Sequence, residues 1–155
     1  MKINNVVVIG SGTMGSGIAA QLCNANIPVT LLDLKTEISQ KAKERIEKSR
    51  PPLLIDKSKI DGIKVGNIND DFNIVSEADW IVEAVVERID IKHDIYDKIF
   101  KQRKKGSIVS SNTSSIPISV LSEKLTEDDK KDFCITHFFN PCLLYTSDAA
   151  DEPRC

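Results

Sequence analysis

The chain has 155 residues, of which 28% are charged and 41% are hydrophobic, and its formal net charge is −2. This length and composition fit one soluble globular domain. The charge lacks the basic excess that nucleic-acid binding needs. The apolar run at the N-terminus is too short for a signal peptide or a membrane span, so we expect a cytoplasmic location. The four cysteines include no CxxC pair, so we expect neither a metal site nor a disulfide framework.

Short apolar runs alternate with helical patterns along the chain. Strands are predicted at residues 5–9, 28–33, 63–67, 80–85, 107–112 and 133–138. Helices are predicted after the first strand and at residues 36–49, 70–79, 88–104 and 116–125, with Thr36 as a possible cap of the second. This alternation predicts an α/β fold with a doubly wound, mostly parallel Rossmann sheet.

A glycine-rich loop follows the first predicted strand. Gly10, Gly12 and Gly15 form G-x-G-x-x-G, in which the glycines allow a tight turn, close approach of a pyrophosphate and close helix–strand contact. The following helix offers free N–H groups and a positive dipole end. Because the motif lies between a predicted strand and a predicted helix, it indicates a dinucleotide site. The expected cofactor contacts of this loop are Gly10, Ser11, Gly12, Thr13, Met14 and Gly15.

Asp33 ends the second predicted strand, 18 residues after Gly15. A carboxylate there accepts hydrogen bonds from a ribose 2′-hydroxyl and repels a 2′-phosphate, which favours NAD over NADP. Lys35 lies close enough to soften this preference. The alternative is an ordinary glycine turn with Asp33 serving only as a cap. Nucleotide binding alone fixes no reaction, because this fold hosts many.

Three polar stretches lie at the ends of later predicted strands. They are "VVERIDIK" (85–92), "SSNTSSI" (110–116) and "THFFNP" (136–141). The carboxyl edge of an open parallel sheet is where ligands bind, so we expect these stretches to meet there.

The succession "GSGTMGSGIA", "EAVVERIDIK", "SNTSS" and "HFFNP" resembles the NAD-binding domain of the 3-hydroxyacyl-CoA dehydrogenases over residues 1–141. The resemblance implies that His137 is the general base for the 3-hydroxyl proton and that Ser114 hydrogen-bonds substrate and cofactor. It also implies cofactor contacts, which are Met14, Asp33, Val85, Val86, Glu87, Lys92 and Asn140.

Simpler interpretations of these residues stay open. A histidine at a strand end is often a satisfied structural group. The serines of "SSNTSS" are also typical of turns and helix caps. Glu87 and Lys92 fit a solvated ion pair at a helix start. His93 has no motif around it and is expected at the surface.

The resemblance ends at Pro141. In the family a strand ending in glutamate follows, and this glutamate orients the histidine; Ala149 stands near its expected position. Residues 142–152, "CLLYTSDAADE", resemble a translated sequencing adapter. We therefore expect an NAD-binding Rossmann domain at 1–141 and a non-native tail at 142–155, with the helical substrate domain missing.

The resemblance implies a parent enzyme that interconverts (S)-3-hydroxyacyl-CoA and 3-oxoacyl-CoA with NAD in fatty acid β-oxidation. Its partner is an acyl-CoA substrate, and the parent is expected to be a homo-oligomer or fused to an enoyl-CoA hydratase-like module. The fragment alone is expected to be inactive. Two alternatives are a non-catalytic NAD-binding module and another Rossmann dehydrogenase acting on a small hydroxy acid. "HFFNP" argues against the latter.

Overall fold

The computed structural model describes residues 2–139. Asn140 and the expected tail at 142–155, with Ala149, lie outside the described residues. No helix within residues 2–139 is long and apolar enough to cross a membrane.

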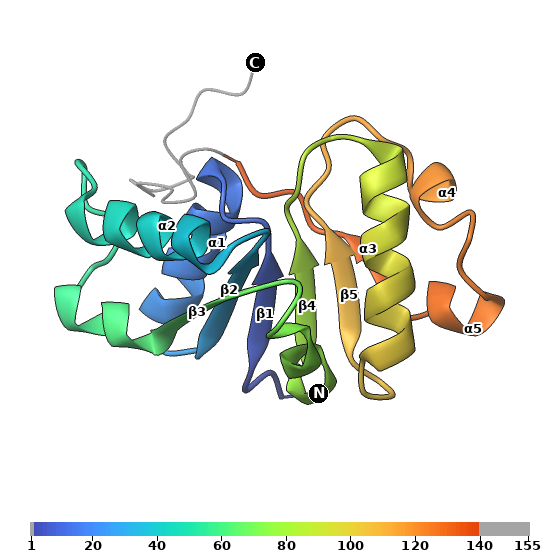
Figure 1. The fold of residues 1–155 in the computed structure, drawn as a ribbon, viewed down its shortest axis with the longest axis horizontal. Helices are drawn as coiled ribbons and strands as arrows, with labels where there is room; N and C mark the ends of the chain where they lie inside the picture. The colour runs from blue at the N-terminus through green and yellow to red at the C-terminus, as the bar shows by residue number, and fades with distance from the viewer. Residues whose placement is uncertain (1, 140–155) are drawn as a thin grey trace, which may run out of the picture.

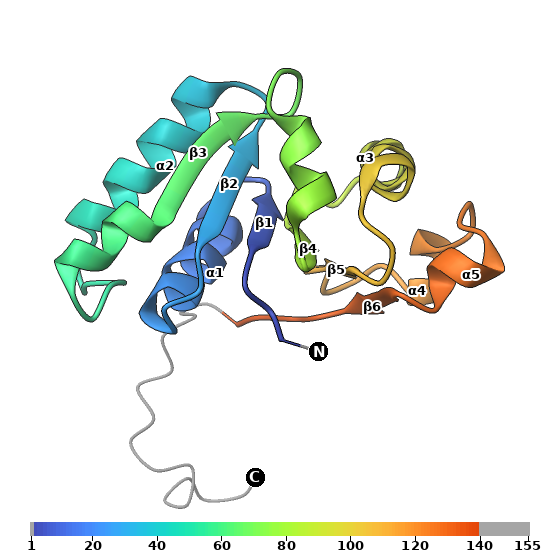
Figure 2. The same ribbon diagram turned by 90° about the horizontal axis from the view of Figure 1, so that it is seen from below.

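Six parallel strands form one sheet in the order β3-β2-β1-β4-β5-β6 (Figures 1 and 2). The strands are β1 (Val6–Ile9), β2 (Val29–Asp33), β3 (Ile63–Asn67), β4 (Trp80–Glu83), β5 (Ile108–Ser111) and β6 (Phe133–Ile135). Val6 of β1 lies opposite Val29 on one side and Trp80 on the other, so the strand order reverses at β1. The doubly wound parallel sheet expected from the sequence is confirmed.

The connections are mostly helical. They are α1 (Thr13–Asn24), α2 (Thr36–Lys48), η1 (Lys57–Gly62), η2 (Phe72–Glu77), α3 (Ile89–Gln102), α4 (Ile118–Leu121) and α5 (Glu127–Lys130). Thr36 does not cap α2, because Lys35 holds the cap position and the Thr36 hydroxyl accepts from Asn67 instead. The helix expected at 116–125 is one turn, because Pro117 precedes it and Ser122 ends it.

Two apolar clusters cover the two faces of the sheet. Alternate residues of β1 belong to different clusters, with Val6 and Val8 in one and Val7 and Ile9 in the other. The first cluster includes buried side chains of α1 and α2, and the second includes those of η2, α3 and α4. Figure 1 shows α1 and α2 beside the β1–β3 half and α3–α5 beside the β4–β6 half. Strands buried on both faces explain the unbroken apolar runs in the sequence.

The contribution of α3 packing to stability can be tested by a substitution at Ile99. Its side chain is fully buried in the second cluster, so Ile99→Ala removes apolar contact and leaves a cavity. We expect the free energy of unfolding to fall by about 2–5 kcal/mol in urea denaturation. Ile55→Ala is the matched control, because Ile55 is 80% exposed, and should change it by less than about 0.5 kcal/mol. Equal effects of the two substitutions would contradict this packing.

Asp79 ties the N-terminal segment to the start of β4. Its carboxylate accepts hydrogen bonds from Lys104 at 2.5 Å and from the backbone N–H groups of Asn4 and Asn5 at 2.7 and 3.1 Å. The Lys104 hydrogen bond and then these two amides lower the pKa of Asp79 to about 2.

The stability contributed by Asp79 should therefore depend on pH. Because its pKa in the folded chain lies below the ordinary value, the contribution is complete above the unfolded pKa and is lost as pH falls toward about 2. Thermal unfolding from about pH 6 to about pH 2 should show a wild-type advantage over Asp79→Asn that shrinks on acidification. A constant difference across this range would refute the assignment.

Candidate functional site

The glycine loop joins β1 to α1 with almost no spare room. Gly10 has φ +101°, and a side chain on it would collide with the Ala84 carbonyl. A side chain on Gly15 would overlap the Gly10 carbonyl oxygen. By contrast, a Cβ on Gly12 would meet nothing within 4 Å, although Gly12 caps α1. The loop is thus packed tightly on its protein side and open where an anion would approach the N-terminus of α1.

Asp33 is the last residue of β2 and lies beside this loop. One carboxylate oxygen accepts from the Ser11 N–H at 2.7 Å and from the Ser11 hydroxyl, and the other accepts from the Leu34 N–H at 2.7 Å. These bonds fix the carboxylate at the carboxyl edge of the sheet, where a further donor such as a ribose hydroxyl is able to reach it.

A first cavity of about 360 Å³ opens between this carboxylate and β4. Its walls are mostly apolar and include Leu34 and Val86, which are 63% and 60% exposed. Its lining residues are Ile9, Gly10, Ser11, Gly12, Asp33, Leu34, Ile38, Arg45, Ile68, Ala84, Val85, Val86, Ile91 and Ile95. An apolar slot that ends at a carboxylate suits an adenine base and its ribose.

Arg45 of α2 is a site residue that the sequence did not reveal. Its guanidinium donates to the Ser11 carbonyl oxygen at 2.9 Å and so reaches back to the glycine loop from the third turn of the helix. In the sequence it is one of several charged residues of an exposed helix, and no motif distinguishes it.

A second cavity of about 330 Å³ lies on the other side of the glycine loop. It is lined by Met14, Ala84, Val85, Glu87, Asn112, Ser114, His137, Phe138 and Phe139. The cavity therefore brings together residues from four sequence-distant segments that the sequence analysis singled out. Ala84 and Val85 line both cavities, whereas the expected contacts Thr13, Gly15 and Lys92 line neither.

Glu87 stands at the rim of the second cavity and is held from two sides. Its carboxylate accepts from the Thr113 hydroxyl at 2.9 and 3.1 Å and from the Ser114 N–H at 3.1 Å, and it pairs with Lys92 at 3.2 Å. Burial raises the pKa of Glu87, but these hydrogen bonds and the Lys92 charge outweigh burial and leave the pKa below its ordinary value. Glu87 is therefore an anion at neutral pH.

Lys92 is buried, and the interpretation as a solvated pair is wrong for it. Its side chain is 1% exposed, and its Nζ lies 2.7 Å from Glu83, whose side chain is fully buried. Glu83 also accepts from the Val85 N–H, the Tyr96 hydroxyl and the Ser111 hydroxyl, at 2.6–2.8 Å. Burial, and then the charge of Glu83, raises the pKa of Tyr96, so the phenol stays protonated and donates.

Glu83 was not among the site residues predicted from the sequence. The available signal was a carboxylate inside the apolar stretch "WIVEAV", since a charge is almost never fully buried unless it is paired. Its partners come from α3 and β5, and their proximity appears only when the sheet is assembled.

His137 follows β6 and faces the second cavity. Its ring lies 4.9 Å from the Phe139 ring, and none of residues 2–139 hydrogen-bonds the imidazole. The segment itself is anchored, because the Phe138 N–H donates to the Asn112 side chain at 2.8 Å and the Phe138 ring packs near Trp80. The described residues thus give the imidazole no hydrogen-bond partner, while Phe138 anchors the neighbouring backbone at the cavity that Ser114 also lines.

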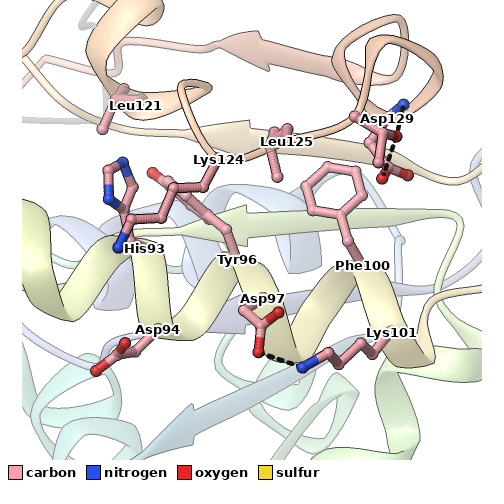
Figure 3. Close-up of a pocket in the computed structure, with 11 residues that line it drawn as sticks. His93, Asp94, Tyr96, Asp97, Phe100, Lys101, Leu121, Lys124, Leu125 and Asp129 are labelled. Carbon is pink, nitrogen blue, oxygen red and sulfur yellow. Dashed lines mark hydrogen bonds and ion pairs between the residues drawn. The ribbon is translucent and has the colours of Figure 1, made fainter.

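Another cavity, of about 370 Å³, lies between α3 and the α4–α5 segment (Figure 3). Three of its five charged lining residues form ion pairs, with Asp97 bound to Lys101 and Asp129 to Arg103. It contains none of the motif residues, so we do not assign the nucleotide to it. The expectation that His93 lies at the surface is wrong: the ring is buried, and its Nε2 lies 2.9 Å from the Val120 carbonyl oxygen, which ties α3 to α4.

Residues 2–139 contain no group of three or more His, Cys, Asp or Glu side chains placed to hold a metal ion.

The chain is similar to known proteins of one family. Residues 5–146 match the family model of the 3-hydroxyacyl-CoA dehydrogenase NAD-binding domain. A protein of Deinococcus radiodurans named as a 3-hydroxyacyl-CoA dehydrogenase is 43% identical over 148 residues, which cover 91% of this chain and 43% of the relative. A fatty acid oxidation complex trifunctional enzyme of Rickettsia felis is 42% identical over 90% of this chain and 20% of its own length.

The solved structure of 3-hydroxybutyryl-CoA dehydrogenase from Escherichia coli K12 superposes with a TM-score of 0.79 at 25% identity. The match covers 92% of this chain and 31% of that one. The chain thus spans less than half the length of these relatives. It belongs to the 3-hydroxyacyl-CoA dehydrogenase family and carries the family's NAD-binding domain.

Proposed function

We propose that this domain serves the NAD-dependent interconversion of (S)-3-hydroxyacyl-CoA and 3-oxoacyl-CoA in fatty acid oxidation. The observation that carries the proposal is the second cavity, where Glu87, Ser114 and His137 meet beside the glycine loop. The names of the relatives point to the same reaction.

The two cavities divide the cofactor between them in this proposal. The first takes the adenosine, with Asp33 at the ribose and with Leu34 and Val86 against the base. The open N-terminus of α1 takes the pyrophosphate, because the N–H groups of Thr13, Met14 and Gly15 precede the first hydrogen bond within the helix. Gly10, Ser11 and Gly12 form the loop beside it, with the Gly10 and Ser11 N–H groups already bonded to Leu32 and Asp33. The second cavity takes the nicotinamide half, between Met14 and Val85 on one side and Glu87 and Ser114 on the other.

The chain's own residues supply the proton chemistry. Bound NAD supplies the hydride acceptor. His137 removes the proton from the 3-hydroxyl through a ring nitrogen, since imidazole is the side chain that most often serves as a general base. Ser114, exposed at the same cavity, hydrogen-bonds the substrate oxygen and holds it toward His137. We assign Asn140 and the Lys92 ammonium to the nicotinamide side of the site, with Lys92 acting from beneath Glu87.

The remaining parts of the proposal concern the whole protein. The trifunctional relative supports a fusion with an enoyl-CoA hydratase-like module. A homo-oligomeric parent is the alternative to this fusion, and a cytoplasmic location completes the proposal. Because the chain spans less than half of its relatives, we expect the 155-residue chain to bind NADH without reducing acetoacetyl-CoA at an appreciable rate.

Gly12→Ala should separate cofactor binding from stability. The added methyl meets no protein atom but enters the space proposed for the pyrophosphate. Fluorescence titration of the 155-residue chain should show NADH affinity reduced about tenfold or more, while the free energy of unfolding falls by at most about 1 kcal/mol from the changed cap.

The matched control is Gly62→Ala in η1, where the added methyl meets only the Cys23 thiol, and it should leave NADH affinity unchanged. Unchanged affinity in Gly12→Ala would refute the proposed pyrophosphate position. Absence of NADH binding by the wild-type chain would refute the cofactor assignment as a whole.

His137→Ala should be tested in a protein of the relatives' full length that carries this domain. Removing the base should lower kcat for oxidation of 3-hydroxybutyryl-CoA by roughly 10²–10⁴-fold, because proton removal then falls to water. The dissociation constant of NADH, measured by fluorescence, should stay within about twofold, since a single side chain at the cavity rim is changed. Normal turnover would exclude His137 as the base.

A further inference from the structure

We propose that Glu83 is a positioning residue for the nicotinamide half of the cofactor site. The inference rests on the proposed function above and extends it to a residue that lines neither cavity. Glu83 ends β4 at the point where the strand order reverses, and its register partners are Ile9 of β1 and Ser111 of β5. It therefore lies next to the loops that follow β4 and β5, both of which line the second cavity.

One route from Glu83 leads through α3 to the cavity rim. Glu83 holds the Lys92 ammonium at 2.7 Å, and the same ammonium lies 3.2 Å from Glu87. Glu87 in turn accepts from Thr113 and from the Ser114 N–H. Because Lys92 is 1% exposed, its ammonium has lost its water and is held by these two carboxylates.

A second route leads through β5. The Ser111 hydroxyl donates to Glu83 at 2.6 Å, and the Asn112 N–H donates to the Glu83 backbone carbonyl at 2.8 Å. The Asn112 side chain then accepts from the Phe138 N–H at 2.8 Å, next to His137. The residue thus braces both the Glu87 side and the His137 side of the same cavity.

The charges of the cluster make its effect local. Two carboxylates share one ammonium, so the cluster carries a net charge of −1 when all three groups are ionised. Glu83 takes the shorter of the two contacts to Lys92, which leaves Glu87 with uncompensated negative charge at the cavity. Neutralising Glu83 gives Lys92 wholly to Glu87, and the ammonium is free to shift toward the rim. The first cavity, lined by Asp33 and Arg45, contains none of these groups.

Glu83→Gln is the direct test, with NADH and ADP as the two probes. ADP reaches only the adenosine cavity and the glycine loop, whereas NADH also needs the second cavity. Glutamine has the same shape as glutamate and keeps the hydrogen bonds of the cluster. Its carbonyl oxygen accepts from Lys92 and the Val85 N–H, and its amide donates to the Tyr96 and Ser111 hydroxyls after they rotate.

We expect the substitution to weaken NADH binding by the 155-residue chain about tenfold and to leave ADP binding within about twofold, as measured by calorimetric titration. A uniform fall in stability would weaken both ligands together, so the ratio of the two affinities separates positioning from damage to the fold.

Two serines at opposite ends of β5 provide a matched pair of further variants. Ser111 and Ser107 are both fully buried, but Ser111 donates to Glu83 whereas Ser107 donates to the Lys104 carbonyl at the opposite end of the strand. Ser111→Ala should lower NADH affinity relative to ADP, and Ser107→Ala should not. These variants decide the question if Glu83→Gln does not fold.

The outcomes are distinguishable. Wild-type chain that binds neither NADH nor ADP overturns the proposed function and this inference with it. Wild-type chain that binds both, with Glu83→Gln and Ser111→Ala keeping the same NADH-to-ADP affinity ratio, overturns only the role of Glu83. Equal losses for both ligands also overturn it.

Discussion

The absence of a side chain at Gly15 is the constraint on which this site depends. A Cβ there would overlap the Gly10 carbonyl, so only glycine lets α1 begin directly beside the end of β1. This closeness points the free N–H groups of α1 over the carboxyl edge of the sheet. It also leaves Ser11 near Asp33 of β2 and Gly10 against Ala84 after β4. Both cavities are therefore built around one contact between two glycines.

The buried ion pair is the second organising feature. A charge moved out of water is costly, and a pair offsets this cost only when further hydrogen bonds satisfy its remaining atoms. Glu83 receives four donors, and no buried side-chain nitrogen or oxygen of the described residues lacks a partner. Such a network adds little to net stability relative to an apolar core, but it holds its members in one arrangement. We expect that rigidity to help orient the nicotinamide half of NAD at the second cavity.

Local patterns predicted much of the fold. "NVVVI" and "PVTLLD" identified strands that are buried on both faces. The glycine loop identified α1, the helix that follows the first of these strands. Element lengths were less predictable, since the strand expected at 133–138 ends at Ile135. The motifs also identified most of the residues around the second cavity, because they follow strand ends and parallel strands end at one edge.

The burial and pairing of several side chains could not be predicted, because they arise only when distant segments assemble. Lys92 lies next to the stripe of Ile91, Ile95 and Ile99 in the sequence. No neighbouring residue in the sequence indicates that its ammonium pairs with a buried carboxylate of β4. His93 likewise becomes buried only because α4 packs across it. Arg45 reaches the glycine loop from a helix whose charged residues look interchangeable in the sequence. Contacts between distant segments decide each of these cases.

The strand order has a consequence for how the chain folds. β1 is central, yet its two neighbours are very unequal in sequence distance, since Val6 pairs with Val29 on one side and with Trp80 on the other. During synthesis the β1–β3 half is able to form early, but one edge of its most apolar strand stays without a partner until β4 emerges. Non-local pairing of this kind slows folding, and an open strand edge invites association with other chains. The β1–β4 seam, beside which the proposed cofactor site lies, therefore closes only after the β1–β3 half has formed.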